Sequence, residues 1–273
     1  DDPNTADLTI SNFVDDVEIA LSQAYLRYQR GGLTLTGGKF ANPFMRTDLV
    51  WDADVNTQGI AASYALPAGG ATFEIHGLYF LIDEDAVGPD STMAGVQTVL
   101  HMPYGEAWRL KLSGAYYDYD LNSLSGADAG DFRSNLRDAS GGYLSDFNLV
   151  NVAGELTYDG FGKRWPVKLY GDYVFNRGAA GNANTGFGAG IALGRAATAG
   201  DWRWSYAYEQ TEVDAVLADL AGEGCVGYWN RDQLPDLLDG KRTGALSRAV
   251  VGRVVSSEPV ADSDHLTLCR VEI

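Results

Sequence analysis

The sequence has no apolar run long enough to form a membrane-spanning helix, and it is poor in residues that bind metals. A transmembrane helix needs about 18 or more consecutive apolar residues, so no such helix is predicted. The 273 residues include only two cysteines and three histidines. His76, His101 and His265 have no metal-ligand spacing with one another or with a cysteine. The sequence therefore predicts no zinc site.

Motifs that identify several enzyme classes are also missing. The sequence contains no phosphate-binding loop, nucleophile elbow or dinucleotide fingerprint. We therefore predict no catalytic residues, no cofactor and no metal. The chain opens with DDPNTADL rather than a basic and apolar leader, so an exported form is expected to have lost its signal peptide.

Ten segments alternate between apolar and polar residues, as a β-strand with one apolar face does. The clearest segment, 108–117, has Trp108, Leu110 and Tyr116 on one side and Arg109 and Lys111 on the other. The ten segments are 20–29, 31–40, 59–66, 71–81, 93–102, 108–117, 151–158, 166–176, 186–194 and 201–211. A soluble β-sandwich also alternates, so the pattern alone leaves two fold classes open.

Segment length and connection length favour a transmembrane barrel over a sandwich. The segments have about ten residues, close to the ~9–11 that a tilted strand needs to cross a bilayer. Short connections lie near 30–32, 67–70, 103–106, 159–164 and 196–200, and long ones span about 42–56, 83–92, 119–146 and 177–185. This alternation collects the long loops at one end, as in outer-membrane barrels with short periplasmic turns.

Tyrosine and tryptophan repeatedly end the apolar stripes. An amphipathic ring at such a position can lie at the level of the lipid headgroups. The candidate aromatic girdle consists of Tyr28, Tyr64, Trp108, Tyr116, Tyr158, Trp202 and Tyr208. This feature also favours a membrane barrel.

The polar faces of the better strands carry nearly balanced charge. The candidate pore-lining residues are Arg27, Arg109, Lys111, Lys168 and Arg203, together with Glu74, Glu155, Asp172 and Glu209. Such residues can set ion selectivity along a permeation path. They can equally pair across neighbouring strands and brace the wall. Both interpretations stay open, and they are compatible.

Acidic residues outnumber basic ones by 37 to 20, so the formal net charge is −17. The excess lies in the N-terminal stretch and in predicted loops, for example Asp83, Glu84, Asp85 and Asp90. We interpret these acids as solvated loop residues, with divalent-cation sites that bridge to lipopolysaccharide as the alternative. An acidic surface argues against nucleic-acid binding by this part of the chain.

A strand and a tight turn at 23–36 are followed by GGKFANPF (37–44), the loop DLVWDADVN (48–56) and the strand GIAASY (59–64). This series resembles the putative porin family of bacterial outer-membrane barrels, and the resemblance extends over roughly residues 15–220. It implies passive diffusion of small hydrophilic solutes through a water-filled barrel, with a homotrimer as the candidate assembly. It also implies an outer loop with Arg46, Asp48, Asp52 and Asp54, which in porins can fold inward and narrow the lumen.

The chain changes character near residue 221. Both cysteines, Cys225 and Cys269, follow this point, and the aromatic-ended strands stop. Residues 250–273 resemble the opening strands of the OB-fold tRNA-binding domain found in the phenylalanyl-tRNA synthetase beta chain. An OB-fold needs about five strands, so at most one hairpin of it is present.

Together these patterns predict an all-β, antiparallel transmembrane β-barrel, of which about ten strands are visible and others are missing. The predicted divisions are the barrel at 1–220, a linker at 221–249 and an OB-like hairpin at 250–273. We interpret the two resemblances as a join of two reading frames, with a divergent barrel end as the alternative.

The predicted function is non-enzymatic diffusion across the bacterial outer membrane, in contact with lipid and lipopolysaccharide. Two alternatives stay open. One is a tRNA-binding OB-fold fragment fused or misjoined to a barrel. The other is an outer-membrane barrel hydrolase.

Overall fold

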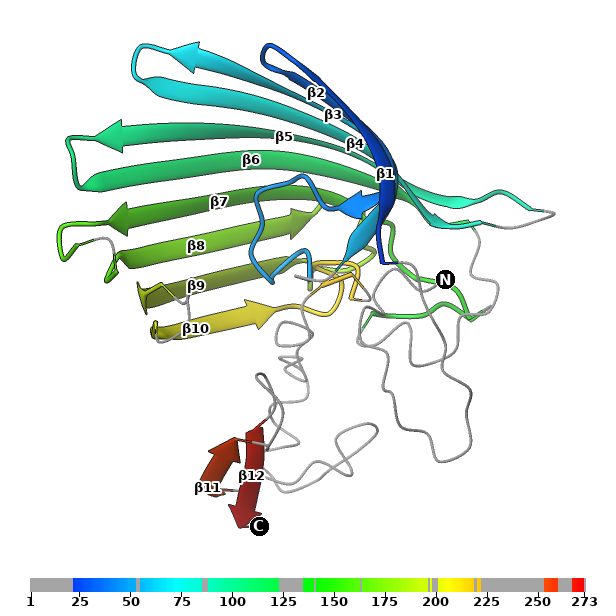
Figure 1. Cartoon of the computed structure of the whole chain (residues 1–273). Coiled ribbons are helices and arrows are strands. Elements are labelled where there is room, and N and C mark those ends of the chain that lie inside the picture. Colours follow the sequence, from blue (N-terminus) through cyan, green and yellow to red (C-terminus); the bar gives the residue numbers. More distant parts are fainter. Residues whose placement is uncertain are drawn as a thin grey trace, which may run out of the picture. The chain divides into compact units, whose positions relative to one another are not determined.

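The computed structural model describes residues 22–221, apart from 53–54, 85–87, 123–134, 140, 163, 196, 198–200 and 219, and the strand residues 253–259 and 267–272. Ten strands form one antiparallel sheet in which each pairs with the next along the chain (Figure 1). They are β1 (Ala24–Arg30), β2 (Leu33–Ala41), β3 (Asn56–Ala68), β4 (Ala71–Asp83), β5 (Ser91–Tyr104), β6 (Trp108–Asp120), β7 (Asn148–Tyr158), β8 (Val167–Asn176), β9 (Thr185–Gly194) and β10 (Arg203–Thr211). The predicted all-β fold of ten antiparallel strands is confirmed.

The register of the sheet keeps the apolar residues of neighbouring strands on one face. Leu112 of β6 lies opposite Leu100 of β5 on one side and Gly154 of β7 on the other. Trp108 likewise lies opposite Tyr104 and Tyr158. Because a slip of one residue would turn every side chain of a strand to the other face, the alternating pattern determines this register.

Connections of two to eight residues, here called the short turns, join the strands at one end of the sheet, and the two longest connections join them at the other (Figure 1). β3 and β4 meet at Gly69 and Gly70, whose φ angles are 56° and 95°. Two successive positive φ values are what a type I′ hairpin turn needs, and glycine adopts them without steric cost. The connections at this second end are residues 42–55, 84–90, 121–147 and 177–184. The predicted alternation of short and long connections is confirmed for 42–55 and 121–147. It is wrong for 84–90 and 177–184, because their seven and eight residues do not exceed the eight of 159–166 and of 195–202 at the opposite end.

The sheet does not close on itself. Among the described strands, β1 pairs only with β2, and β10 pairs only with β9. This agrees with the prediction that the visible strands form part of a barrel wall. Both edges therefore present rows of backbone N–H and C=O groups for which the described strands supply no ladder partner.

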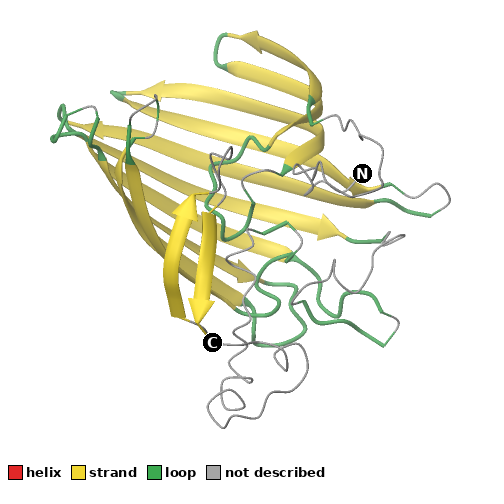
Figure 2. Ribbon diagram, turned by 60° about the horizontal axis from the view of Figure 1, so that its bottom comes forward, coloured by secondary structure: helices red, strands yellow, loops and turns green. Residues whose placement is uncertain are grey.

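The hydrophobic core lies between one face of the sheet and three segments: residues 42–55, the described part of 121–147, and residues 212–221 after β10. Figure 2 shows loops gathered against this side of the sheet. The core combines sheet residues with loop residues. Its largest members include Phe40, Phe80, Met93, Tyr117 and Leu149 from strands, and Leu49, Trp51, Phe147 and Leu220 from loops. We call the covered face the inner face and the opposite face the outer face.

Within the described residues, no helix is long and apolar enough to cross a membrane. The chain divides into two units, Asp1–Trp229 and Asn230–Ile273. In the second unit, β11 (Arg253–Pro259) pairs antiparallel with β12 (Thr267–Glu272). The OB-fold resemblance of this hairpin, the domain boundaries and the reading-frame join stay predictions. The predicted linker lies outside the described residues, except for Ala221.

Candidate functional site

The outer face of the sheet is apolar and exposed. Along β6, Trp108, Leu112 and Tyr116 are 37–44% exposed, whereas Ser113 and Tyr117, on the inner face, are buried. The same split recurs on the other strands. Exposed residues of the outer face include Tyr28, Leu35, Ile60, Tyr64, Leu66, Phe73, Ile75, Tyr79, Val96, Val152, Leu169, Tyr173, Phe187, Leu193, Trp204, Tyr206 and Tyr208. An apolar surface of this extent marks contact with an apolar partner or a membrane.

The predicted girdle aromatics lie at two levels of the outer face. Tyr28, Tyr64, Trp108, Tyr158 and Trp202 lie toward the short turns, and Tyr116 and Tyr208 lie toward the long connections. The Trp108 and Tyr158 rings are 4.5 Å apart, and Phe161 packs edge-on against Tyr158. Contact of these rings with lipid headgroups stays a prediction.

The connection between β2 and β3, residues 42–55, folds onto the inner face. The Met45 N–H donates to Gln97 Oε1 at 2.6 Å, and Gln97 Nε2 donates to the Met45 carbonyl at 2.7 Å. The Thr47 hydroxyl donates to Asp172, whose other oxygen accepts from Asn151. These bonds hold the loop to β5 and β8, three strands apart.

The same loop is held by a buried aromatic cluster. Trp51 is 1% exposed, and its ring centroid lies 5.6 Å from that of Tyr117 and 6.4–6.5 Å from those of Phe44, Phe80 and Tyr119. Arg46, Asp48 and Asp52 belong to this loop, which is bonded to the inner face at β5 and β8. That the loop narrows a lumen stays a prediction. Asp54 lies outside the described residues.

Residues 212–221, which follow β10, pack against the 42–55 loop and the 121–147 connection. Asp214 is 2% exposed and accepts from the Ser145 hydroxyl at 2.6 Å and from the Leu136 N–H at 3.0 Å. The Asp52 N–H donates to the Leu220 carbonyl at 2.8 Å. No periodic signal in the sequence marks these contacts, because they join irregular segments far apart in the chain.

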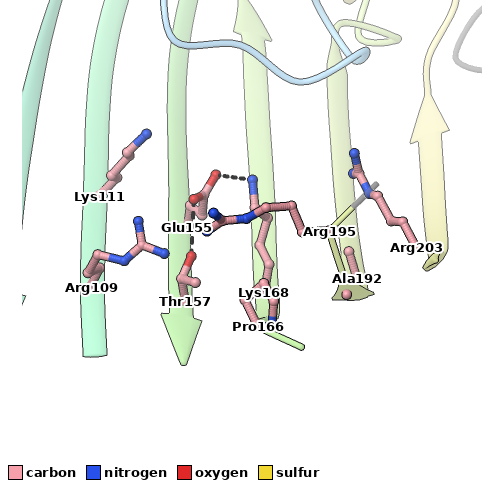
Figure 3. Close-up of a pocket in the computed structure, with 10 residues that line it drawn as sticks. Arg109, Lys111, Glu155, Thr157, Pro166, Lys168, Ala192, Arg195 and Arg203 are labelled. Atoms are coloured by element: carbon pink, nitrogen blue, oxygen red, sulfur yellow. Dashed lines mark hydrogen bonds and ion pairs between the residues drawn. The ribbon is translucent and has the colours of Figure 1, made fainter. Parts of the chain in front are cut away.

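Between the 42–55 loop and the short turns, five cationic side chains line one groove of the inner face. Arg109 and Lys111 come from β6, Lys168 from β8, Arg203 from β10, and Arg195 directly follows β9. The groove has a volume of about 370 Å³ and is shown in Figure 3. We call it the basic groove.

Small residues on β9 leave space for the basic groove. Lys168 lies opposite Ala192, and Arg203 lies opposite Gly194, in the register of the sheet. Both small residues line the groove. The long cationic side chains therefore extend over a hollow of the inner face instead of packing against large neighbours.

Two of the five cations are held by carboxylates, and Glu155 is the only acid among the described residues that line the groove. Lys168 Nζ donates to Glu155 Oε2 at 2.7 Å. Arg109 binds Asp159 with two hydrogen bonds of 2.8 and 3.0 Å. Among the described residues, Lys111, Arg195 and Arg203 form no ion pair. The groove thus carries an excess of positive charge.

A second polar cluster lies on β3, β4 and β5 of the inner face. Ser63 Oγ is 2.8 Å from His76 Nδ1, and His76 Nε2 is 3.2 Å from Glu74 Oε2. His101 Nε2 lies 3.4 Å from the same Glu74 oxygen. Within the described part of the chain, no group of three or more His, Cys, Asp or Glu residues is arranged to hold a metal ion.

The nine candidate pore-lining residues lie on the inner face in separate places. Arg109, Lys111, Glu155, Lys168 and Arg203 meet in the basic groove. The others do not line it: Glu74 belongs to the histidine cluster, Arg27 packs over the Tyr25 ring and donates to Thr36, Asp172 anchors the 42–55 loop, and Glu209 lies opposite Gly188. Of the cross-strand pairs in the bracing interpretation, the structure forms Lys168–Glu155. The pore-lining role of all nine stays a prediction.

Arg195 lines the groove but was missed by sequence reasoning. The candidates were taken from the polar faces of strands, and Arg195 lies just after β9 ends at Gly194. A residue in a connection has no alternation to indicate which way it faces, so no sequence signal identified it.

An antiparallel meander with an exposed apolar outer face, and an inner face that a loop crosses and that is polar beyond the loop, is typical of membrane β-barrels. The model of a family described as "Putative porin" matches residues 1–131. This match covers β1–β6 and confirms the resemblance noted at 23–65. No curated protein and no solved structure matches the chain.

Proposed function

We propose that this chain forms the wall of an outer-membrane porin, through which small hydrophilic solutes diffuse passively. The observation that carries the proposal is that one set of strands combines an exposed apolar outer face with an inner face whose part toward the short turns is polar and hollowed. Lipid can cover the first face, and water the second. The family match over residues 1–131 supports the same conclusion.

The open edges of the sheet bear on the size of the pore. Unpaired backbone groups cannot face lipid, so β1 and β10 must be covered in a membrane. If β1 paired directly with β10, a ten-stranded barrel would leave little lumen, because about eight strands are already filled by side chains. We therefore propose that further strands complete the wall of the functional pore, and that the 42–55 loop narrows it.

Heat-modifiable migration and solute uptake test the proposed function together. Protein that carries the completed wall, refolded in detergent, is expected to migrate differently before and after boiling, because a closed barrel resists detergent until heated. Liposomes containing it are expected to swell in small sugars faster than in large ones. Absence of both effects, in protein that is soluble without detergent, would contradict the proposal.

The remaining partner assignments are proposals of the same kind. Contact with lipopolysaccharide is checked by co-purification before and after removal of divalent cations. The homotrimer is checked by chemical crosslinking in detergent. For the tRNA alternative, a gel-shift that weakens steeply with salt is needed.

Hydrolysis is the second candidate, and the specific observation in its favour is the Ser63–His76–Glu74 series. A hydroxyl, an imidazole and a carboxylate in hydrogen-bond sequence resemble the parts of a nucleophilic site. Such a site also needs N–H donors that bind a developing oxyanion. β3 is paired on both sides, with β2 and β4, so its N–H groups around Ser63 belong to the ladders. This favours diffusion over hydrolysis.

A further inference from the structure

We propose that the basic groove binds small polyvalent oxyanions, of the phosphate and pyrophosphate type, and makes the pore prefer anions to cations. This inference rests on the proposed diffusion function for its transport part. The binding part concerns the groove itself.

The cations form a track across the wall instead of a single point. Arg109 and Lys168 lie two strands apart, and Arg203 lies two strands further. At about 4.8 Å per strand step, these four steps span about 19 Å. Lys111 lies one inner-face position along β6 from Arg109, so the track has a second row toward the 42–55 loop. An anion can therefore contact more than one cation at a time.

The paired and unpaired cations have different parts in this site. The Lys168–Glu155 and Arg109–Asp159 pairs hold two of the side chains in position. Arg195 and Arg203 keep their charge available, since they form no ion pair among the described residues. Lys111 lies opposite Glu155 in the register, but that carboxylate forms its ion pair with Lys168. A guanidinium presents a planar fork of donors that fits two oxygens of one oxyanion. Clustered charges of one sign in a hollow also raise the local concentration of counter-ions.

The composition of the whole chain predicts the opposite preference. With a net charge of −17, a pore whose charges acted uniformly would favour cations. The basic groove lies on the inner face beside the 42–55 loop, so a solute that passes the loop meets cations at close range. Exposed charges further away than about 10 Å are largely screened at 0.1 M salt. The positive charge of the groove should therefore affect a permeating ion more than the negative charge of the acidic outer loops does.

Ion selectivity in a planar bilayer of zwitterionic phosphatidylcholine tests the inference. Under a potassium chloride gradient, the unmodified protein should show a chloride-to-potassium permeability ratio above one. The double variant Lys111→Gln, Arg203→Gln should lower this ratio about fivefold. This is the combined effect on chloride and potassium of removing two unit charges that each act over about 8 Å in a water-like dielectric, screened with a Debye length of about 10 Å. The matched control Arg30→Gln, Arg177→Gln removes two exposed charges outside the groove and should leave it unchanged.

Titration calorimetry with pyrophosphate separates this inference from the diffusion function. Detergent-folded protein should bind pyrophosphate, and the groove variant should bind it at least about fivefold more weakly than the control. If this holds and no channel appears, the groove inference stands and the diffusion function fails. A cation-preferring or unselective channel, or equal binding by both variants, overturns the groove inference. Binding of anionic-lipid vesicles without binding of pyrophosphate would also overturn it, because it would assign the groove to lipid headgroups.

Discussion

The replacement Gln97→Leu should release the inward loop without disturbing the sheet. Gln97 is fully buried on β5, and its amide forms a reciprocal pair of hydrogen bonds with the Met45 backbone. Leucine has a similar size but neither donates nor accepts a hydrogen bond. The substitution therefore leaves the N–H and the C=O of Met45 without these partners while the loop stays in place.

The expected magnitude follows from those two groups. A buried polar group that loses its partner costs about 1–3 kcal/mol, so two groups cost at least about 2 kcal/mol. Opening the loop lets water satisfy both groups, so this cost favours the open loop. A shift of about 2 kcal/mol corresponds to about a 30-fold rise in the open population, because ~1.4 kcal/mol is a factor of ten.

Hydrogen exchange measured by mass spectrometry checks this prediction in detergent-folded protein. Peptides that cover residues 42–52 should lose at least tenfold protection, whereas β6 and β7 should keep theirs. The matched control is Gln29→Leu, which makes the same chemical change at an exposed glutamine that bonds to Thr34 and not to the loop. Unchanged exchange at 42–52, or equal loss in the strands, would refute the reasoning. In a bilayer, the same variant should show a larger single-channel conductance.

Three further predictions concern the core, one close backbone approach and the second candidate function. Trp51→Ala should lower the free energy of unfolding by about 3–5 kcal/mol, because it empties a buried aromatic site. Urea titrations measure this, and the control Trp202→Ala, at a residue 76% exposed, should change the free energy of unfolding little. Gly38→Ala should lower the free energy of unfolding clearly more than Gly69→Ala does in the same titrations. Both glycines have positive φ, but a Cβ at Gly38 would lie 2.8 Å from Tyr25 Cα, whereas Gly69 has open space; at Gly69 the backbone alone costs about 1–2 kcal/mol. A fluorophosphonate probe should not label the protein, since no N–H pair on β3 is available to bind an oxyanion; labelling that disappears in Ser63→Ala would restore the hydrolase candidate.

The strand pattern was predictable because it is local. The alternation of side chains along residues 108–117 of β6 is enough to assign each of them to a face. It predicts Arg109 and Lys111 on the polar side, and the structure places them on the face opposite to the apolar side chains. Strand ends were less predictable. The predicted segment 93–102 extends to 91–104 in β5, since pairing with β6 continues to Tyr104 beyond the alternating residues.

The candidate site was only partly predictable. Lys168 belongs to β8, yet its neighbours in the groove are Glu155 on β7 and Ala192 on β9, which are 13 and 24 positions away in the sequence. The aromatic cluster around Trp51 was not predictable from the sequence pattern either. The 42–55 loop has no periodicity, and the rings that contact Trp51 include Phe80 of β4 and Tyr117 of β6.

The sequence by itself determined the fold class, the ten strands, which side chains share a face and at which end the long loops lie. These properties follow from the alternation of side chains along each strand and from the order of short and long connections. Only the tertiary structure decided that five cations from four separate segments share one groove, and that the 42–55 loop crosses the inner face to meet Gln97 and Asp172. The physical reason is that lateral neighbours depend on the register of every strand pair, and loop contacts depend on residues far apart in the chain.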